Sequence, residues 1–414
     1  MILFYTHQLH SRISYVASVL FKDILGAEIE ITNNKENFKQ FKGVKISYTN
    51  EPISDELFYK SSSLLFETTI SKNTTLPSDP FAKSFYLLSR YEEYLPFTKD
   101  RYGRFSAKES ASYQNNILTK PTVNIFAQEL KKQIEAKHPN FLFPNKKYLF
   151  TPTLDIDNAY AYRGKSIIRT IAGYLRSIAK GDIQDIIARF NVVTKKKLDP
   201  YDSYELQFKI HKKYNLNPIY FFLLANWGEN DKNLPYAHPL MQSLIKNISS
   251  VAEIGIHPSY GSNKFPALIS IEKKRLEDSL GKKITKSRQH FLKLTFPQTY
   301  RNLISSGIQD DYSMGYADEI GFRAGICSPF PFYDLEKEEI TNLIIHPFPV
   351  MENTLNNYMK LSPEKALDKV KEVIKEIKNV NGEFISIWHN QTLNEQKEWK
   401  GWGEFYEKVI QEAL

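Results

Sequence analysis

The sequence contains a single cysteine, Cys327, among its 414 residues. One cysteine excludes a framework of internal disulfides and agrees with a cytoplasmic location. Long apolar runs are absent too, because the longest, Ile219–Ala225, is far shorter than the roughly 18 residues needed to span a membrane. The amino-terminal residues lack the basic region, the uninterrupted apolar stretch and the small-residue cleavage site of a secretion signal. We therefore expect a soluble protein of the cytoplasm.

The charged residues argue against nucleic acid as a partner. The net charge is +8, but the basic residues are dispersed among 47 acidic ones and no nucleic-acid-binding motif is visible. The densest basic stretch, Arg163–Lys197, opens with apolar residues at near-helical spacing: Ile167, Ile168, Ile171, Leu175 and Ile178. Its first half predicts an amphipathic helix. That helix either packs on the domain or docks on an anionic membrane face or an anionic glycan.

The chain divides near residue 145. With 14% aromatic and 25% charged residues it has the composition of an ordered globular protein of two or more domains. Residues 1–145 predict a small α/β domain of unknown function, with strands at Leu3–Tyr5, 27–31, 44–48 and 64–67 and a helix from Arg12 to Leu25. Asp79-Pro80 predicts a further helix start. Because no catalytic signature lies there, a chain beginning near Pro144 is expected to keep the functional site.

Residues 146–414 alternate strand-like and helical patterns. The strand-like runs lie near 148–157, 217–225, 252–259, 284–291, 307–314, 341–351 and 383–390. A helix is predicted to begin at Ser362-Pro363-Glu364, with Gly382 beyond its end. This βα order predicts parallel strands in an irregular (β/α) barrel.

Five short segments each end an apolar run with a group that can bind a metal or move a proton: Thr153–Asp157, Ile254–His257, Ser287–His290, Gln309–Tyr312 and Ile385–His389. Parallel strands deliver such groups to one rim, so these segments predict one pocket of a mononuclear metal hydrolase. Asp155 and Asp157, two residues apart on a strand, should project to the same side. Alone, a DxD of this kind equally well caps a loop or a helix.

In their order, these segments resemble the motifs of the polysaccharide deacetylases, the NodB-like carbohydrate esterases. Thr153–Asp157 resembles the family's TFDxD motif. The resemblance implies removal of N- or O-acetyl groups from sugars with one divalent metal ion, usually zinc. It implies that Asp155 is the base that activates water and that Asp157 is a metal ligand.

The second and third motifs depart from the family pattern. The family's H-S/T-x-x-H reads His257–Gly261 here, without the second histidine, and its R-x-P-Y reads Arg288–Phe291, with His290 in place of proline. The resemblance implies that Arg288 orients the base. We infer that His290 replaces the missing ligand and completes the set Asp157, His257 and His290, with Ser262 as the weaker alternative.

The last two motifs complete the site that the resemblance implies. Asp311 is similar to the fourth-motif aspartate, which pairs with the arginine or holds the catalytic histidine, and Asp310 could take its place. His389, at the end of an apolar strand, matches the histidine that protonates the leaving group. The resemblance covers about Lys147–Leu414 and implies the irregular (β/α) barrel of the family, preceded by the added small α/β domain.

The expected function is that of a metal-dependent deacetylase, a hydrolase of carbon–nitrogen bonds acting on an acetylated sugar or glycan. The alternative is a non-catalytic relative that binds carbohydrate or serves as a scaffold. Two further residues have open roles. His346 either is structural or lines the pocket, and Arg323 either binds an anionic substrate group or pairs with a carboxylate such as Asp318.

Overall fold

The computed structural model describes residues 1–414 and divides into two compact units. Unit 1 comprises Met1–Phe150, Leu294–Val350 and Val370–Ile385, and unit 2 comprises Thr151–Lys293, Met351–Lys369 and Ser386–Leu414. Unit 1 therefore consists of the amino-terminal segment and two segments from later in the chain. The division into sequence domains 1–145 and 146–414 stays a prediction.

Unit 1 contains a four-stranded parallel sheet in the order β2-β1-β3-β4. Its strands are β1 (Ile2–Thr6), β2 (Ile29–Thr32), β3 (Val44–Thr49) and β4 (Leu57–Lys60). The strand predicted at 64–67 is wrong, because Ser63–Phe66 forms a 3-10 helix. Leu64 and Leu65 are both buried. A strand would turn these neighbours to opposite faces, whereas a helical turn lets both reach the core.

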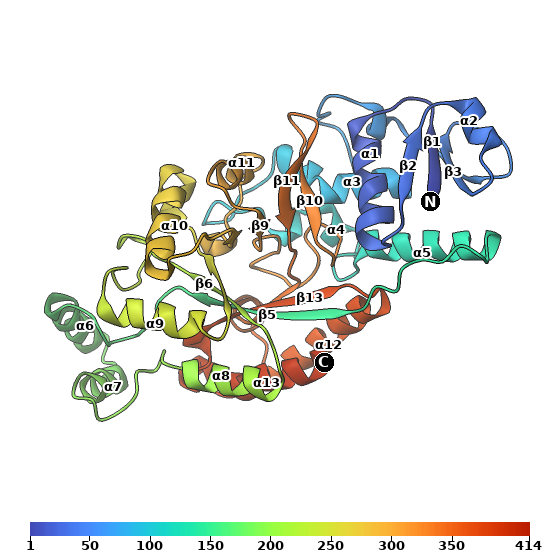
Figure 1. The fold of residues 1–414 in the computed structure, drawn as a ribbon. Helices are drawn as coiled ribbons and strands as arrows, with labels where there is room; N and C mark the ends of the chain where they lie inside the picture. Colours follow the sequence, from blue (N-terminus) through green and yellow to red (C-terminus); the bar gives the residue numbers. More distant parts are fainter. The chain divides into compact units, whose positions relative to one another are not determined.

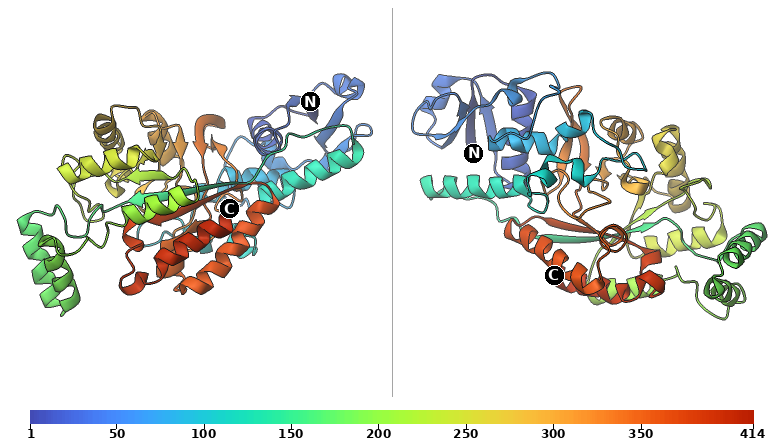
Figure 2. Two further views of the ribbon diagram at one scale, coloured as in Figure 1. Left: turned by 60° about the horizontal axis from the view of Figure 1, so that its bottom comes forward. Right: turned by 180° about the vertical axis from the view of Figure 1, so that it is seen from behind.

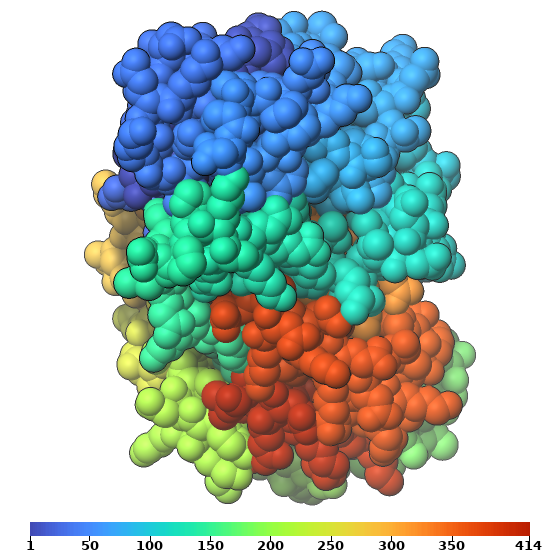
Figure 3. Space-filling model, turned by 90° about the vertical axis from the view of Figure 1, so that its right-hand side faces the viewer, coloured from blue at the N-terminus to red at the C-terminus, as the bar shows by residue number.

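The helices of the amino-terminal segment are α1 (Ser11–Ala17), α2 (Lys35–Gln40), α3 (Pro80–Leu88), α4 (Ala111–Gln114) and α5 (Thr122–Lys137). The helix predicted from Arg12 is confirmed, with its second half, Ser18–Ile24, in π-helical form. The predicted start of α3 is confirmed as well, since the Asp79 carboxylate accepts hydrogen bonds from the first free N–H groups of the helix. Figure 3 shows this segment, blue to blue-green, as one closely packed mass.

Buried polar contacts tie the amino-terminal segment to residues 294–350 of the same unit. Arg12 pairs with Glu338, and the Tyr15 hydroxyl donates to the carbonyl of Pro331 at 2.8 Å. Glu93 accepts from Arg323 at 2.8 Å. A chain that begins near Pro144 would lack Arg12, Tyr15 and Glu93, so Glu338, the Pro331 carbonyl and Arg323 would lose these partners. The expectation that such a chain keeps the functional site stays a prediction.

The later part of unit 1 adds α11 (Gln298–Ser305), β9 (Asp310–Asp311), β10 (Phe330–Asp334) and β11 (Glu339–Ile345). The central strand β11 pairs parallel with β9 and antiparallel with β10. Three elements lie at the boundaries of the units: β12 (Val350–Met351), α12 (Pro363–Asn379) and β13 (Glu383–His389). The predicted start of α12 at Pro363 is confirmed.

Unit 2 is built on the parallel strands β5 (Leu149–Ile156), β6 (Ile219–Phe222), β7 (Glu253–Ile256) and β8 (Lys286–Ser287). Its helices are α6 (Ile167–Ala179), α7 (Ile183–Val193), α8 (Tyr204–Lys213), α9 (Pro239–Ser249), α10 (Ala267–Leu280) and α13 (Trp402–Ala413). Figures 1 and 2 show α8, α9 and α10 beside these strands, while α6 and α7 stand apart. The mixed α/β class with parallel strands is confirmed, and closure into a barrel stays a prediction.

The register of unit 2 aligns the carboxyl ends of its strands. Ile156 lies opposite Phe222, which lies opposite Ile256, and Ile256 lies opposite Ser287. The residue that follows each of β5, β7 and β8 therefore emerges at one edge of the sheet. No helix of the chain has both the length and the apolar composition needed to cross a bilayer.

Candidate functional site

Three residues at this edge of unit 2 form a compact cluster of metal-ligand type. One ligand atom each from Asp157, His257 and His290 lies within 4.8 Å of the other two. His257 Nε2 is 3.2 Å from Asp157 Oδ1, and His290 Nε2 is 3.6 Å from Asp157 Oδ2. The cluster is the set predicted from the sequence.

The two imidazoles are oriented by hydrogen bonds on their far side. His257 Nδ1 lies 2.5 Å from the carbonyl oxygen of Arg288, so it must carry the proton and donate. His290 Nδ1 lies 2.8 Å from Oδ1 of Asp231. Because Nδ1 is engaged in both rings, Nε2 is the nitrogen left to face Asp157, as is usual for histidines that bind metal.

Two properties of the Asp157 carboxylate fit a group that binds a cation. Its Oδ1 is buried and has no hydrogen-bond partner. Burial alone would raise the pKa of Asp157, but the imidazoles of His290 and His389 hold this pKa well below its ordinary value. The side chain keeps 20% of its surface exposed, against 2% for His257 and 7% for His290. A small ion or substrate can therefore reach the cluster past Asp157.

Asp231 is a site residue that the sequence analysis missed. Besides His290, its carboxylate accepts hydrogen bonds from the backbone N–H groups of Tyr260 at 2.9 Å and Gly261 at 3.2 Å. It thus joins the loop that follows His257 to the ring of His290. The only signal in the sequence is an acidic residue after Gly228, which is common in loops.

The weaker ligand candidate, Ser262, is used differently. Its hydroxyl donates to the carbonyl of Ser259 at 2.6 Å, within the loop after β7. His290, by contrast, offers a ligand atom within 4.8 Å of those of Asp157 and His257. The geometry therefore favours His290 over Ser262 as the third ligand.

Asp155 lies beside the cluster, as predicted from its position two residues before Asp157. Its Oδ1 accepts a hydrogen bond of 2.7 Å from Arg288, and its Oδ2 is 3.8 Å from His257 Nε2. Both partners are buried. Arg288 thus fixes the orientation of this carboxylate and leaves the second oxygen directed toward the ligand set.

His389, at the end of β13, belongs to the same cluster. Its Nε2 is 3.6 Å from Asp157 Oδ2, while Nδ1 is 2.7 Å from Glu352 Oε1. Burial acts to lower the pKa of His389, but Glu352 and then Asp157 outweigh it and raise the pKa to about 10. Glu352 was not identified from the sequence, where it is an ordinary acidic residue after β12.

Asp311 was expected to pair with Arg288 or to hold His389. In the structure Glu352 holds His389, and Asp155 accepts from Arg288. Asp311 lies in β9 of unit 1, where it is buried and accepts from the backbone and hydroxyl of Ser313, both at 2.9 Å. A catalytic role for Asp311 stays a prediction.

The charge balance of the cluster favours a cation. One carboxylate belongs to the cluster and three lie around it, and Arg288 donates to one of these three. The four are Asp157 in the cluster, and Asp155, Asp231 and Glu352 around it. For His290, burial would lower the pKa, yet Asp157 and Asp231 raise it to about 9. Buried carboxylates need compensating charge, which protonated imidazoles or a bound divalent ion can supply. The donor set therefore fits a divalent metal.

The remaining candidates have structural partners in unit 1. Arg323 forms a buried ion pair with Glu93, so the structure agrees with the pairing with a carboxylate, although the partner is Glu93 and not Asp318. Asp318 instead accepts a hydrogen bond from the backbone of Ala107. His346 is 2.8 Å from Asp310 and stacks on Tyr312, which agrees with the structural alternative.

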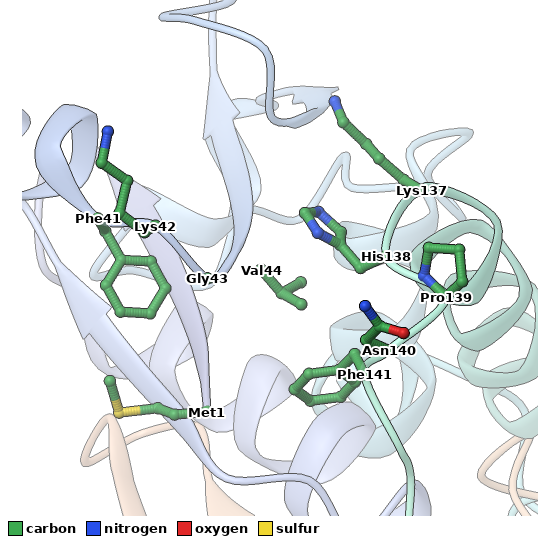
Figure 4. A pocket seen from close by; sticks show the side chains of 10 residues that line it. All are labelled: Met1, Phe41, Lys42, Gly43, Val44, Lys137, His138, Pro139, Asn140 and Phe141. Atoms are coloured by element: carbon green, nitrogen blue, oxygen red, sulfur yellow. The ribbon is translucent and has the colours of Figure 1, made fainter.

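Two cavities lie elsewhere. The one in unit 1 has a volume of about 690 Å³ and is shown in Figure 4, where Phe41, His138 and Phe141 surround its mouth. None of the predicted catalytic or metal-ligating residues lines it. The other, of about 630 Å³ in unit 2, is lined in part by Lys165, Arg169 and Trp227.

Residues 2–139 match a protein-family model described as "Family of unknown function (DUF7033)". The chain matches no curated protein. It is similar to a solved structure of a "putative polysaccharide deacetylase" from Mycobacterium smegmatis, with 12% identity over 66% of this chain and 86% of the other, at a TM-score of 0.43.

Two further solved structures are similar to the chain. A CE4 family pseudoenzyme from Bacillus anthracis has 9% identity over 66% of this chain and 63% of its own, at a TM-score of 0.29. IcaB from Ammonifex degensii has 12% identity over 42% and 85%, at a TM-score of 0.24. TM-scores at this level are too low to support an assignment of function, which must come from the site itself.

Proposed function

We propose that this protein is a metal-dependent deacetylase that hydrolyses an N- or O-acetyl group on a sugar or polysaccharide precursor in the cytoplasm. The observation that carries the proposal is the cluster of Asp157, His257 and His290, whose ligand atoms lie within 4.8 Å of one another beside a carboxylate fixed by an arginine. The order of the motifs along the chain supports the same function. Asp157, His257 and His290 would hold the ion, most simply Zn²⁺.

A bound Zn²⁺ would supply two effects, polarisation of the acetyl carbonyl and a lowered pKa of about 7 for water. Asp155 would accept a proton from the attacking water. Arg288 holds Oδ1 of Asp155, and Oδ2 is turned toward His257. This fixed carboxylate is suited to general base catalysis because it needs no reorientation before the reaction.

His389 gives a proton to the leaving amine or alcohol. Glu352 binds Nδ1, so Nε2 faces the cluster. With its pKa raised, the ring is protonated at neutral pH. A cation held by Asp157 would oppose this protonation and lower the pKa of His389 from its raised value.

The second candidate function is that of a non-catalytic carbohydrate-binding or scaffold protein. The departures at the second and third motifs favour it. The pairing of base with Arg288 and of acid with Glu352 favours an enzyme, since neither pairing is needed for binding alone.

Metal analysis coupled with acetate release tests the proposal. The purified protein is analysed for bound metal and assayed on N-acetylated and O-acetylated amino-sugar oligomers, with and without chelator. We expect one divalent ion per chain and acetate release that the chelator abolishes. Asp155→Asn and His389→Ala should retain the metal and lose at least about 100-fold in turnover.

Two results would contradict the proposal. Metal binding without acetate release from any acetylated sugar would favour the scaffold function. Loss of metal in Asp155→Asn would show that this residue is a ligand and that the assigned roles of Asp155 and Asp157 are wrong.

A further inference from the structure

The helices α6 and α7 of unit 2 form a pair joined by a short turn. The Ser166 hydroxyl caps α6, the Asp182 carboxylate caps α7, and Gly181 between the helices has a left-handed φ of 66°. The amphipathic helix predicted from the sequence is confirmed as α6, whereas α7 was not predicted. Figures 1 and 2 show the pair apart from the remaining helices of unit 2.

The two helices pack on each other through small and polar residues. Ser177 on α6 donates to Asp185 on α7, and Asp185 also pairs with Arg189 at 3.1 Å. Arg189 lies against Gly173, where any Cβ would collide with the guanidinium. The contact between the two helices therefore does not involve their large apolar side chains.

The large apolar side chains of α6 and α7 are exposed to solvent. Each of nine large apolar residues in the pair has at least half of its surface accessible: Ile167, Ile168, Ile171, Leu175, Ile178, Ile183, Ile187, Phe190 and Val193. On α6, five of them fall at spacings of three and four, which places them along one face. Exposed apolar side chains in this number on two adjoining helices indicate an interaction site in a folded protein. The alternative that α6 packs on the domain by this face is excluded.

Basic residues accompany the apolar surface. The segment 163–197 has nine basic and two acidic residues and a net charge of +7, in a chain whose total is +8. Arg176, Lys180 and the run Lys195–Lys197 are exposed. On α6, Arg169 and Arg176 lie away from the aliphatic face. An apolar face with a basic polar face is the signature of a helix that lies in the interface of an anionic membrane.

We propose that the α6–α7 pair docks this protein on the surface of an anionic lipid bilayer. The 13 residues of α6 measure about 20 Å, too short for a bilayer core of about 30 Å, so the helix lies in the plane of the membrane. The apolar side chains enter the interface, and the basic residues attract the headgroups. This inference is independent of the proposed catalysis.

Two other binding partners for the exposed surface of α6 and α7 fit the observations less well. A second copy of the chain placed face to face would set one +7 segment against another, which is unfavourable around a two-fold interface. An anionic glycan would use the basic residues but leaves nine large apolar side chains exposed to water. Only a lipid surface satisfies both the charge and the apolar area.

Vesicle sedimentation tests the proposal with the full-length protein. Vesicles of phosphatidylcholine alone are compared with vesicles to which phosphatidylglycerol is added. We expect strong partitioning only to the second, weakened by salt. The triple variant Ile168→Gln, Ile171→Gln, Leu175→Gln and the triple variant Lys195→Ser, Lys196→Ser, Lys197→Ser should each lose on the order of 100-fold in partitioning. Leu142→Gln, at a leucine of unit 1 that is even more exposed, is the control and should bind as the wild type does.

A fluorescent probe gives a second readout. Cys327 is buried, so a thiol-reactive polarity probe should label Ile171→Cys selectively. Its emission should shift to the blue on anionic vesicles, whereas the same probe at Leu142→Cys should not shift.

Three results would overturn the proposal: no partitioning of the wild type, unchanged partitioning of the aliphatic variant, or vesicle-independent dimers that the aliphatic variant abolishes. Binding to polygalacturonate but not to vesicles would identify an anionic glycan instead.

Discussion

His290 and Asp231, which are 59 positions apart in the chain, are joined by a hydrogen bond of 2.8 Å between Nδ1 of the imidazole and Oδ1 of the carboxylate. The same carboxylate accepts from the loop that follows His257. Asp231 thus joins the ring of His290 to the loop that follows His257, while lying outside the proposed ligand set. Partners of this kind commonly contribute roughly 10- to 100-fold to metal affinity.

Asp231→Asn should therefore bind the metal roughly 10- to 100-fold more weakly, as measured by competition with a fluorescent chelator. Asp199→Asn is the matched control, because Asp199 is also buried and accepts from the backbone N–H groups of Ala161 and Tyr162 at 2.8 Å but contacts no imidazole. It should lower stability without changing metal affinity. Equal losses of affinity in both variants would reduce the role of Asp231 to folding.

The choice between His290 and Ser262 as third ligand is open to a direct comparison. His290→Ala should lose bound metal, because only Asp157 and His257 would remain. Ser262→Ala should keep it, since this hydroxyl is bonded to Ser259. Metal analysis of both variants decides the matter. The reverse result would restore Ser262 as the ligand.

Glu352 should set the pH range of the proposed acid. After burial, which acts in the opposite direction, Glu352 is the first cause of the raised pKa of His389. In Glu352→Gln the amide oxygen can still accept from Nδ1, but the negative charge is gone and the pKa of His389 falls. The basic limb of the kcat profile should then move to lower pH by roughly one unit, with metal content unchanged. An unmoved limb would exclude His389 as the titrating acid.

Much of this site could be predicted because catalytic groups follow short apolar strands, and parallel strands end at a common edge. The sequence alone was enough to group Asp157, His257 and His290 on that basis. Asp231 and Glu352 could not be added to the group, since each is an isolated acid in a loop or at a short strand, and only tertiary contacts bring it to an imidazole. Local patterns carry no information about such pairings.

The fold, like the site, could be predicted only where local sequence patterns determine it. Some positions follow from local patterns, since α1, α3 and α12 begin at or next to the residues predicted, whereas the strand predicted at 64–67 is wrong and α7 was not predicted. The composition of unit 1 could not be foreseen, because it depends on contacts between residues hundreds of positions apart. The ion pair of Glu93 with Arg323 is one of these.

That ion pair gives a stability prediction. Glu93 is buried between Arg90 and Arg323, and after burial, which acts to raise it, these two guanidiniums keep the pKa of Glu93 low. Glu93→Gln would leave two buried cations short of compensation and should lower the free energy of unfolding by about 3 kcal/mol. Urea titration measures this. Glu336→Gln, at an exposed partner of Arg301, should change it by less than about 1 kcal/mol. A loss in Glu93→Gln no larger than in Glu336→Gln would argue against the pair as a link within unit 1.

Glu272 should make unit 2 sensitive to pH. Burial raises the pKa of Glu272 to about 7 from an ordinary value of 4.5, against the hydrogen bond of 2.8 Å that it accepts from the Ser259 N–H. The folded state binds the proton more tightly than the unfolded chain. The stabilisation from Glu272 is therefore complete below pH 4.5 and is lost as the pH rises through 7. Glu272→Gln keeps an acceptor for Ser259 and cannot ionise.

Relative to the wild type, Glu272→Gln should therefore gain stability as the pH rises across this window, by up to about 3 kcal/mol. Urea titrations of both proteins at about pH 5 and about pH 8, with and without chelator, give the difference directly. Comparison with the wild type at each pH cancels the other titrating groups. A difference that stays constant between the two pH values would mean that Glu272 is already ionised in the folded protein and is neutralised by a neighbour such as Arg275, whose charge lowers its pKa.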